Sequence, residues 1–225
     1  MNNDQSSSST YELYHYFRSS CSYRVRIALN IKKIPCQFHA VNLLKNEQNE
    51  QNEQKLDYQK INPQRLVPSL ITPDKKIITQ SLSIIEYLEE LYPEPALLPQ
   101  EPILKAKVRA FAQAIACEIH PINNLRVLNY LKQDLNLKEE QVNAWYQHWI
   151  NLTFLDLEQI AKLNSGRFCF GDQPTLADIV LVPQIYNAHR YKVDMSAYPT
   201  LSQIDKNCSE LPAFQAAHPD QFAGS

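Results

Sequence analysis

The stretch "RSSCSYRVRIAL", residues 18–29, joins an aromatic-rich segment to a helical one. The segment before it, "YELYHYF" at residues 11–17, is short and rich in tyrosine, which is typical of a β-strand. Within the stretch, apolar side chains recur at helical spacing from Val25 to Leu29. We therefore predict a strand followed by a helix that begins near residues 20–22.

Small polar side chains lie at this strand-to-helix turn, those of Ser19, Ser20 and Cys21. The free N–H groups and the dipole of a helix N-terminus attract anions. One serine is explained as a helix cap. Another hydroxyl can donate to a bound thiolate, and a cysteine here can itself be the thiolate, because such sites lower the pKa of a thiol. The residues alone leave capping and chemistry both open.

The segments that follow complete a small α/β domain. "CQFHAVNL" alternates and predicts a second strand, so the first helix makes a crossover between two parallel strands. "LVPSLIT" and "KIITQ" flank the turn "PDKK" and predict a hairpin. A short helix in "KLDYQKIN" and an amphipathic helix in "SLSIIEYLEELYP" give the order β-α-β-α-β-β-α over residues 11–92.

The rest of the chain has helical periodicity after a proline-rich segment, "EPALLPQEP". Helices are predicted at residues 103–119, 121–135, 139–163, 176–191 and near 201–208. The expected organisation is a disordered tail (1–9), an α/β domain (10–92), a linker (93–102) and an all-helical domain (103–225).

Composition excludes several classes of function. The net charge of −2 gives no nucleic-acid surface, and no apolar run approaches the roughly 20 residues of a membrane span. The polar N-terminus has no secretory signal. Five cysteines without a CxxC motif argue against a disulfide framework and a structural zinc site, and they fit the reducing cytoplasm. The three glycines form no phosphate-binding loop.

Two further motifs are candidates for ligand binding. In "LVPSL", a cis bond before Pro68 would turn the backbone of Val67 outward to pair with an extended peptide, whereas a trans proline would simply start the strand. In "TQSLSII", Gln80 and Ser81 lie at another strand-to-helix turn, where Ser81 caps the helix or a ligand carboxylate binds. The motifs together indicate a small peptide-like ligand with a thiol and carboxylates.

Long strings of this sequence resemble the zeta class of glutathione S-transferases. They are "SSCSYRVRIAL", "NPQRLVPSL", "QSLSIIEYLEE", "IHPINNLRVL" and "GDQPTLADIVLVPQIYNAHRYKVDMSAYPT". The resemblance implies a thioredoxin-like N-terminal domain with an all-α C-terminal domain, glutathione as cofactor, and a homodimer. Because the class includes maleylacetoacetate isomerase, it also implies cis–trans isomerisation of maleylacetoacetate in tyrosine and phenylalanine degradation.

The resemblance also implies roles for single residues. Ser19 and Cys21 would be catalytic beside the glutathione sulfur, with Ser20 as the expected helix cap. Arg18 and Arg190 would bind the dicarboxylate substrate, because guanidinium pairs with carboxylate in a two-pronged way. Arg24 flanks the thiolate turn, with a solvated helix face as the alternative. The expected glutathione-binding residues are Ser19, Ser20, Cys21, Ser22, Tyr23, Arg24, Val67, Pro68, Gln80, Ser81, His120, Asn124, Leu125 and Arg126.

Two segments carry other expectations. In "PTLAD", Thr175 and Asp178 predict a capping box, and Pro183 falls inside the helix that follows, so this motif is interpreted as structural. The triplets "NEQNEQNEQ", residues 46–54, predict a solvated loop and replace a family segment near glutathione.

Other functions are compatible with these motifs. Within the same fold, the chain could be a general glutathione transferase or a maleylpyruvate isomerase. It could instead be a non-enzymatic binding module, or a thiol–disulfide oxidoreductase that uses Cys21 alone.

Overall fold

The computed structural model describes residues 10–45, 47–49 and 58–223. Chain contacts divide the molecule into an N-terminal unit, Met1–Pro95 with Ala216–Ser225, and a helical unit, Ala96–Gln215. The C-terminal segment thus packs with the N-terminal unit rather than with the predicted helical domain of residues 103–225. The predicted tail of residues 1–9 and most of the predicted loop at 46–54 lie outside the described residues.

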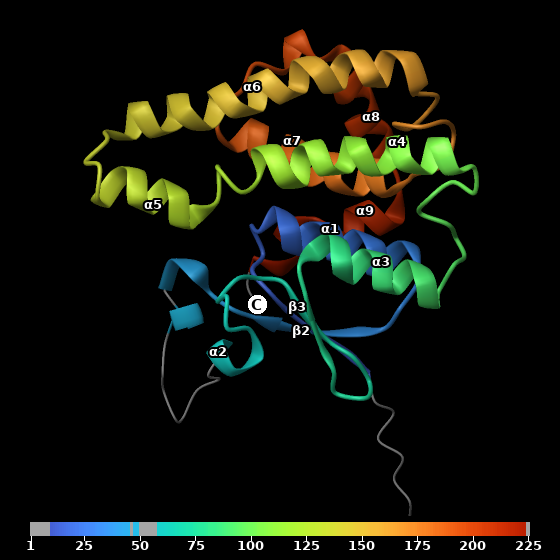
Figure 1. Cartoon of the computed structure of the whole chain (residues 1–225), viewed down its shortest axis with the longest axis horizontal. Helices are drawn as coiled ribbons and strands as arrows, with labels where there is room; N and C mark the ends of the chain where they lie inside the picture. Colours follow the sequence, from blue (N-terminus) through green and yellow to red (C-terminus); the bar gives the residue numbers. More distant parts are fainter. Residues whose placement is uncertain (1–9, 46, 50–57, 224–225) are drawn as a thin grey trace, which may run out of the picture. The chain divides into compact units, whose positions relative to one another are not determined.

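The N-terminal unit contains a four-stranded sheet in the order β2-β1-β3-β4 (Figure 1). β1 pairs with β2 in parallel and with β3 antiparallel, and β3 and β4 form the predicted hairpin. The predicted element order is confirmed. Its elements are β1 Tyr11–His15, α1 Ser20–Ile31, β2 Cys36–Ala40, the 3-10 turns Leu43–Lys45 and Glu47–Asn49, α2 Tyr58–Ile61, β3 Ser69–Ile71, β4 Ile77–Thr79 and α3 Ser81–Leu91.

The alternation of side chains along β1 builds two layers. Leu13 and His15 are fully buried on the face where α1 and α3 lie side by side (Figure 1). Tyr14 points to the opposite face, where its ring lies 6.0 Å from that of Tyr58 in α2. Successive strand residues point to opposite faces, so one aromatic strand serves both layers.

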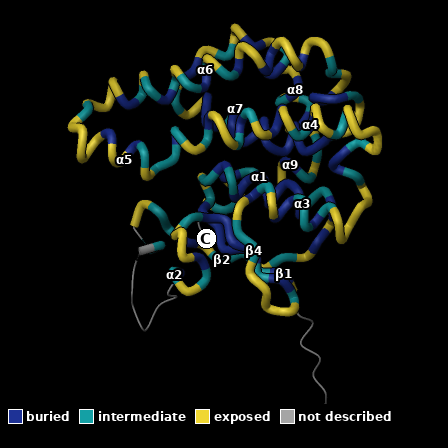
Figure 2. The backbone as a smooth tube through the Cα atoms, in the orientation of Figure 1, coloured by how far each residue is buried: buried dark blue, intermediate teal, exposed yellow. Residues whose placement is uncertain are grey.

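The helical unit confirms the five predicted helices and adds a π-helical segment. α7 is buried on nearly all sides because its sequence is apolar around the whole helix, whereas α6 is exposed along one side (Figure 2). Among the described residues, no helix is long and apolar enough to cross a membrane. The elements are α4 Pro102–Gln113, the π-helix Ala114–Ile119, α5 Leu125–Gln133, α6 Glu139–Asn164, α7 Leu176–Arg190 and α8 Pro199–Ser209.

The predicted capping box at the start of α7 is confirmed. The Thr175 hydroxyl accepts from the N–H of Ala177, and the Asp178 carboxylate accepts from the N–H of Thr175 at 2.8 Å. Asp178 also accepts from the N–H of Cys169 at 2.8 Å, so it ties the preceding loop to the helix. This position is structural, as its motif predicted.

The end of the chain is held to the N-terminal unit by Arg26 of α1. Its Nε donates to the carbonyl of Ala217 at 2.9 Å, its Nη2 donates to the carbonyl of Phe17 at 3.1 Å, and its guanidinium lies 4.6 Å from the Phe222 ring centre. Ala217 ends α9, Pro212–Ala217, and Phe222 ends the 3-10 turn Pro219–Phe222. The apolar spacing of the helix did not predict a buried position for Arg26. The residue is nevertheless fully buried, with distant partners for its charged side chain.

Candidate functional site

Three candidate segments meet at one edge of the sheet in the N-terminal unit. β1 ends at His15 just before Ser19, and its residue Tyr14 pairs with Ser69, which starts β3 directly after Pro68. Ser69 in turn pairs with Thr79, which ends β4 directly before Gln80. The register therefore brings the two strand-to-helix turns and the Val67–Pro68 bond to the same edge.

Ser19 is the N-cap of α1. Its backbone is extended, and its hydroxyl accepts from the N–H of Ser22 at 3.2 Å. The expectation that Ser20 is the cap is therefore wrong, because Ser20 already has a helical position and is buried. A hydroxyl has two acceptor lone pairs and one donor hydrogen. Ser19 can therefore cap the helix and donate to an anion at the same time.

The side chain of Arg24 is buried, which overturns the alternative of a solvated helix face. The residue is 1% exposed. Its Nη1 lies 3.6 Å from Sγ of the half-buried Cys21 and 3.4 Å from Oγ of Ser81. Arg24 therefore joins the first turn of α1 to the first turn of α3, across 57 residues of sequence.

The Val67–Pro68 peptide bond is cis. Among the described residues, no hydrogen bond involves the main-chain N–H or C=O of Val67. The carbonyl just before it, that of Leu66, accepts from the Tyr58 hydroxyl and from Nδ2 of Asn62, each at 2.7 Å. The chain is thus fixed on one side of Val67 and leaves a donor and an acceptor for an extended ligand.

Gln80 and Ser81 form the second turn. α3 begins at Ser81, so the expectation that Ser81 is its cap is wrong; the cap position belongs to Gln80, whose side chain makes no capping bond. Gln80 has φ 69° and ψ 119°, a conformation that costs a non-glycine residue about 1–3 kcal/mol. Its Nε2 donates to Oε1 of Gln64 at 3.0 Å. Strained residues of this kind cluster at ligand sites.

Other predicted residues of the N-terminal unit point inward or to solvent. Ser22 is buried and its hydroxyl accepts from the N–H of Tyr16 at 3.4 Å. The buried Tyr23 ring packs edge-on against His218 at 6.0 Å. Arg18 is exposed, with its guanidinium 5.0 Å from the Phe17 ring. Of these residues, only Arg18 presents a charged side chain to solvent.

The remaining predicted residues belong to the helical unit. His120 directly follows the π-helical segment, and its N–H donates to the carbonyl of Ile115 at 3.0 Å. Asn124 caps α5 by accepting from the N–H of the exposed Arg126 at 3.1 Å, and Leu125 is the first residue of that helix. The exposed Arg190 ends α7.

Sequence patterns did not predict the π-helix, the burial of Arg24, or the support that Tyr58 and Asn62 give to Leu66. The one local indication was "NP" at residues 62–63, which is typical of a turn. π-helical turns occur often at functional sites, so the π-helical segment just before His120 is a second reason to keep this residue as a candidate.

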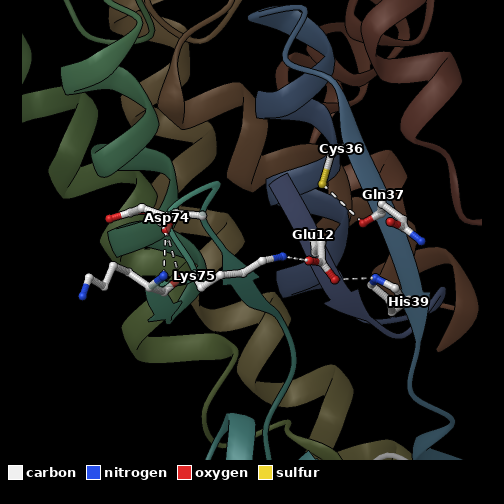
Figure 3. Close-up of polar contacts among 8 residues, drawn as sticks. Glu12, Cys36, Gln37, His39, Asp74 and Lys75 are labelled. Atoms are coloured by element: carbon white, nitrogen blue, oxygen red, sulfur yellow. Dashed lines mark hydrogen bonds and ion pairs between the residues drawn. The ribbon is translucent and has the colours of Figure 1, made fainter. Parts of the chain in front are cut away.

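A second polar cluster lies on the sheet and joins residues of β1, β2 and the β3–β4 turn (Figure 3). The Glu12 carboxylate accepts from Nζ of Lys75 at 2.7 Å and from Nε2 of His39 at 3.0 Å. Hydrogen bonding to Lys75 is the main reason that the pKa of Glu12 lies below its usual range. Lys75 is in the turn at the far end of the β3–β4 hairpin, so we interpret this cluster as structural. No group of three or more metal-binding side chains occurs among the residues with described positions.

Segments in both units of the chain are similar to known proteins. Family models of the glutathione S-transferase N-terminal and C-terminal domains match residues 13–96 and 143–216. The chain is 47% identical to the probable maleylacetoacetate isomerase of Vibrio cholerae over 208 residues, which cover 92% of this chain and 95% of that protein.

Two solved structures are also similar. One is a bacterial maleylpyruvate isomerase in its holo form, a zeta-class glutathione S-transferase, with TM-score 0.87, 43% identity, and 92% of this chain and 96% of that chain covered. The other is the maleylacetoacetate isomerase of Anaeromyxobacter dehalogenans with dicarboxyethyl glutathione and citrate in its active site, with TM-score 0.83, 38% identity, and 94% and 92% covered. The predicted resemblance is confirmed, and the chain belongs to the glutathione S-transferase family.

Proposed function

We propose that this protein is a zeta-class enzyme that isomerises maleylacetoacetate to fumarylacetoacetate with glutathione as its cofactor. The observation that carries the proposal is the sheet edge where the Ser19 hydroxyl, the unpaired backbone of Val67 and the N-terminus of α3 meet. The strong similarity to maleylacetoacetate isomerases supports the choice of substrate.

The residues of this edge fit an extended thiol tripeptide. The free N–H and C=O of Val67 can pair with the cysteinyl backbone of glutathione, as one strand pairs with another. The γ-glutamyl carboxylate would lie at the N-terminus of α3, near Gln80 and Ser81, where main-chain N–H groups and the helix dipole favour a negative charge. The thiol would then lie beside Ser19 and Cys21.

Glutathione, when bound, supplies a thiolate that adds to the cis double bond and leaves again after rotation about the resulting single bond. Ser19 would donate its hydroxyl hydrogen to the sulfur and so hold it in the thiolate form. Each unit by which the thiol pKa falls requires about 1.4 kcal/mol of preferential stabilisation of the anion. The N-terminal turn of α1 would contribute to it, and Cys21 is a close neighbour.

Arginine side chains would bind the substrate carboxylates. Arg18 and Arg190 are exposed, and a guanidinium can form two-pronged contacts with a carboxylate. Nη1 of Arg190 also donates to Oδ1 of Asn187 at 3.3 Å, a contact within α7. We further propose a homodimer in which Asn124, Leu125 and Arg126 contribute to the glutathione site. The five free cysteines are compatible with a reducing cytoplasm, where tyrosine and phenylalanine degradation would take place.

The direct test is isomerisation of maleylacetoacetate with glutathione present in catalytic amount. We expect fumarylacetoacetate to accumulate while the glutathione concentration stays constant. If glutathione is consumed in proportion to substrate and no isomer forms, the protein is a general transferase. If the chain does not bind glutathione at about millimolar concentration, the binding-module alternative replaces the proposal.

The role of Ser19 needs a pair of variants, because this residue also caps α1. Ser19→Ala removes the cap at a cost of about 1 kcal/mol, whereas Ser19→Gly costs only a few tenths. Both variants remove the hydroxyl, so both should lose activity by the same large factor despite their different stability. Cys21→Ala should lose activity only in part; its complete inactivation would favour a thiol–disulfide oxidoreductase.

Maleylpyruvate is the second candidate substrate, because one of the most similar solved structures is a maleylpyruvate isomerase. Both substrates have a cis double bond conjugated to a carbonyl and a carboxylate at each end. The comparison of kcat/KM for the two under identical conditions decides between them, and we expect the larger value for maleylacetoacetate.

A further inference from the structure

We propose that Arg24 is a positioning residue for glutathione, which holds the Ser81 hydroxyl as a donor to the γ-glutamyl carboxylate and balances its charge from inside the domain. The inference rests on the proposed function. It adds a role for a residue that acts through Ser81 and does not itself touch the substrate. It differs from the sequence-based expectation that Arg24 touches the ligand itself.

The surroundings of Arg24 are unusual for a buried cation. Among the described residues, the partners of its guanidinium all contact Nη1; they are Oγ of Ser81 at 3.4 Å and Sγ of Cys21 at 3.6 Å. Its Nε and Nη2 are buried, and neither finds a hydrogen-bond partner within the described part of the chain. A guanidinium remains charged at every physiological pH, and no described carboxylate forms an ion pair with this one.

The two other buried cations of the same unit provide a contrast. Lys32 forms an ion pair with Glu89 at 2.6 Å and also donates to the carbonyl of Pro95 at 3.1 Å. Arg26 donates to two main-chain carbonyls. Taking an unpaired charge out of water costs several kcal/mol, so a structural residue normally has such partners. Nε and Nη2 of Arg24 lack them among the described residues, and the contact of Nη1 with Ser81 places this guanidinium beside the start of α3.

The chemistry of the contact fixes the direction of the Ser81 hydroxyl. Arginine only donates hydrogen bonds, so Nη1 must donate to Oγ of Ser81. The hydroxyl hydrogen of Ser81 then remains for another acceptor, and the neighbouring positive charge makes it a stronger donor. Ser81 is the first residue of α3, where the helix N-terminus also favours an anion. These groups together favour a carboxylate.

The experiment measures binding of glutathione and of cysteinylglycine, which lacks the γ-glutamyl group, by calorimetry. The variants are Arg24→Met, Ser81→Ala, their combination, and Arg26→Met as a control for loss of a buried arginine. We expect Arg24→Met to weaken glutathione binding about 10- to 100-fold, the range for a lost charge-assisted hydrogen bond. Its affinity for cysteinylglycine should change less than about twofold on the same scale.

Two further readouts separate positioning from structural support. In the Ser81→Ala background, Arg24→Met should weaken glutathione binding much less than it does alone, because the part of its effect that passes through the Ser81 hydroxyl is already lost. KM for glutathione should rise with kcat at saturating glutathione nearly unchanged. The melting temperature of free Arg24→Met should not fall below that of the wild type, whereas Arg26→Met should melt earlier and bind both ligands in the wild-type ratio.

The outcomes are distinct. Equal loss of affinity for both ligands in Arg24→Met, or multiplied losses in the double variant, would overturn the inference and leave the proposed function standing. Failure of the wild type to bind glutathione would overturn both. Should Arg24→Met not fold, Arg24→Lys supplies the test: it keeps the charge without the planar fork, and a selective loss for glutathione supports the inference while an equal loss refutes it.

Discussion

Protonation of His15 should make the folded protein sensitive to mild acid. The imidazole is fully buried at the end of β1, with ring contacts to Phe38 at 5.5 Å and Phe222 at 5.3 Å. Nη1 of Arg26 lies 3.3 Å from its Nδ1 and must donate, so Nδ1 accepts and the ring is neutral. Burial, and then the charge of Arg26, lowers the pKa of His15 from 6.5 to about 3.

The sign and size of the effect follow from linkage. Below about pH 6.5 the unfolded chain binds a proton at this imidazole, whereas the folded chain does not until about pH 3. The unfolded state therefore binds more protons, and stability is lost as the pH falls through this window. From about pH 7 to about pH 5, this one site should lower the free energy of unfolding by about 2 kcal/mol.

The assay is urea unfolding at these two pH values for the wild type and His15→Gln. Glutamine keeps an acceptor for Arg26 but does not titrate. On acidification, the free energy of unfolding of the variant should therefore fall by about 2 kcal/mol less than that of the wild type. Subtracting the change in the free energy of unfolding of the variant from that of the wild type cancels the contribution of the other titrating groups. Equal acid sensitivity of the two proteins would show that His15 titrates normally, and the argument from burial would fail.

Three other substitutions test particular contacts. Asp178→Asn should lower the free energy of unfolding by about 2–4 kcal/mol in urea, because the carboxylate holds the N–H of Thr175 inside the core. Tyr58→Phe should cost about 1 kcal/mol of stability and raise the Kd for glutathione, since its hydroxyl fixes the Leu66 carbonyl. Phe222→Ala should speed hydrogen exchange at residues 216–223 with little change in the helical unit, because this ring packs on Arg26.

Local rules predicted much of the fold. The tyrosine-rich run of β1, the turn between β3 and β4, and the capping box of α7 each depend on residues within a few positions, and each appears where the sequence indicated. The candidate edge was predictable for the same reason, since Ser19, Val67 and Gln80 lie in short motifs. Strand register then brings those motifs together.

Long-range partners explain what the sequence did not reveal. Arg26 is buried because carbonyls at Phe17 and Ala217 accept from it, and the second of these is 191 residues away. No periodicity in α1 can indicate a partner at the other end of the chain. The cap of α1 is Ser19, one residue before the predicted Ser20. Either serine suits the cap position chemically, and the extended backbone of Ser19 decides between them.

Two costly local arrangements of the N-terminal unit adjoin the same residue, Ser81. Gln80 holds a left-handed φ of 69° directly before Ser81, and Arg24, which forms no ion pair among the described residues, contacts the Ser81 hydroxyl. A fold selected only for stability would replace the first by glycine and the second by an apolar side chain. Both features lie at the start of α3, where the proposed γ-glutamyl carboxylate would compensate the positive charge. Under the proposed function, the cost borne by the free protein would be part of the binding energy for its anionic ligand, and the site would be prepared before glutathione arrives.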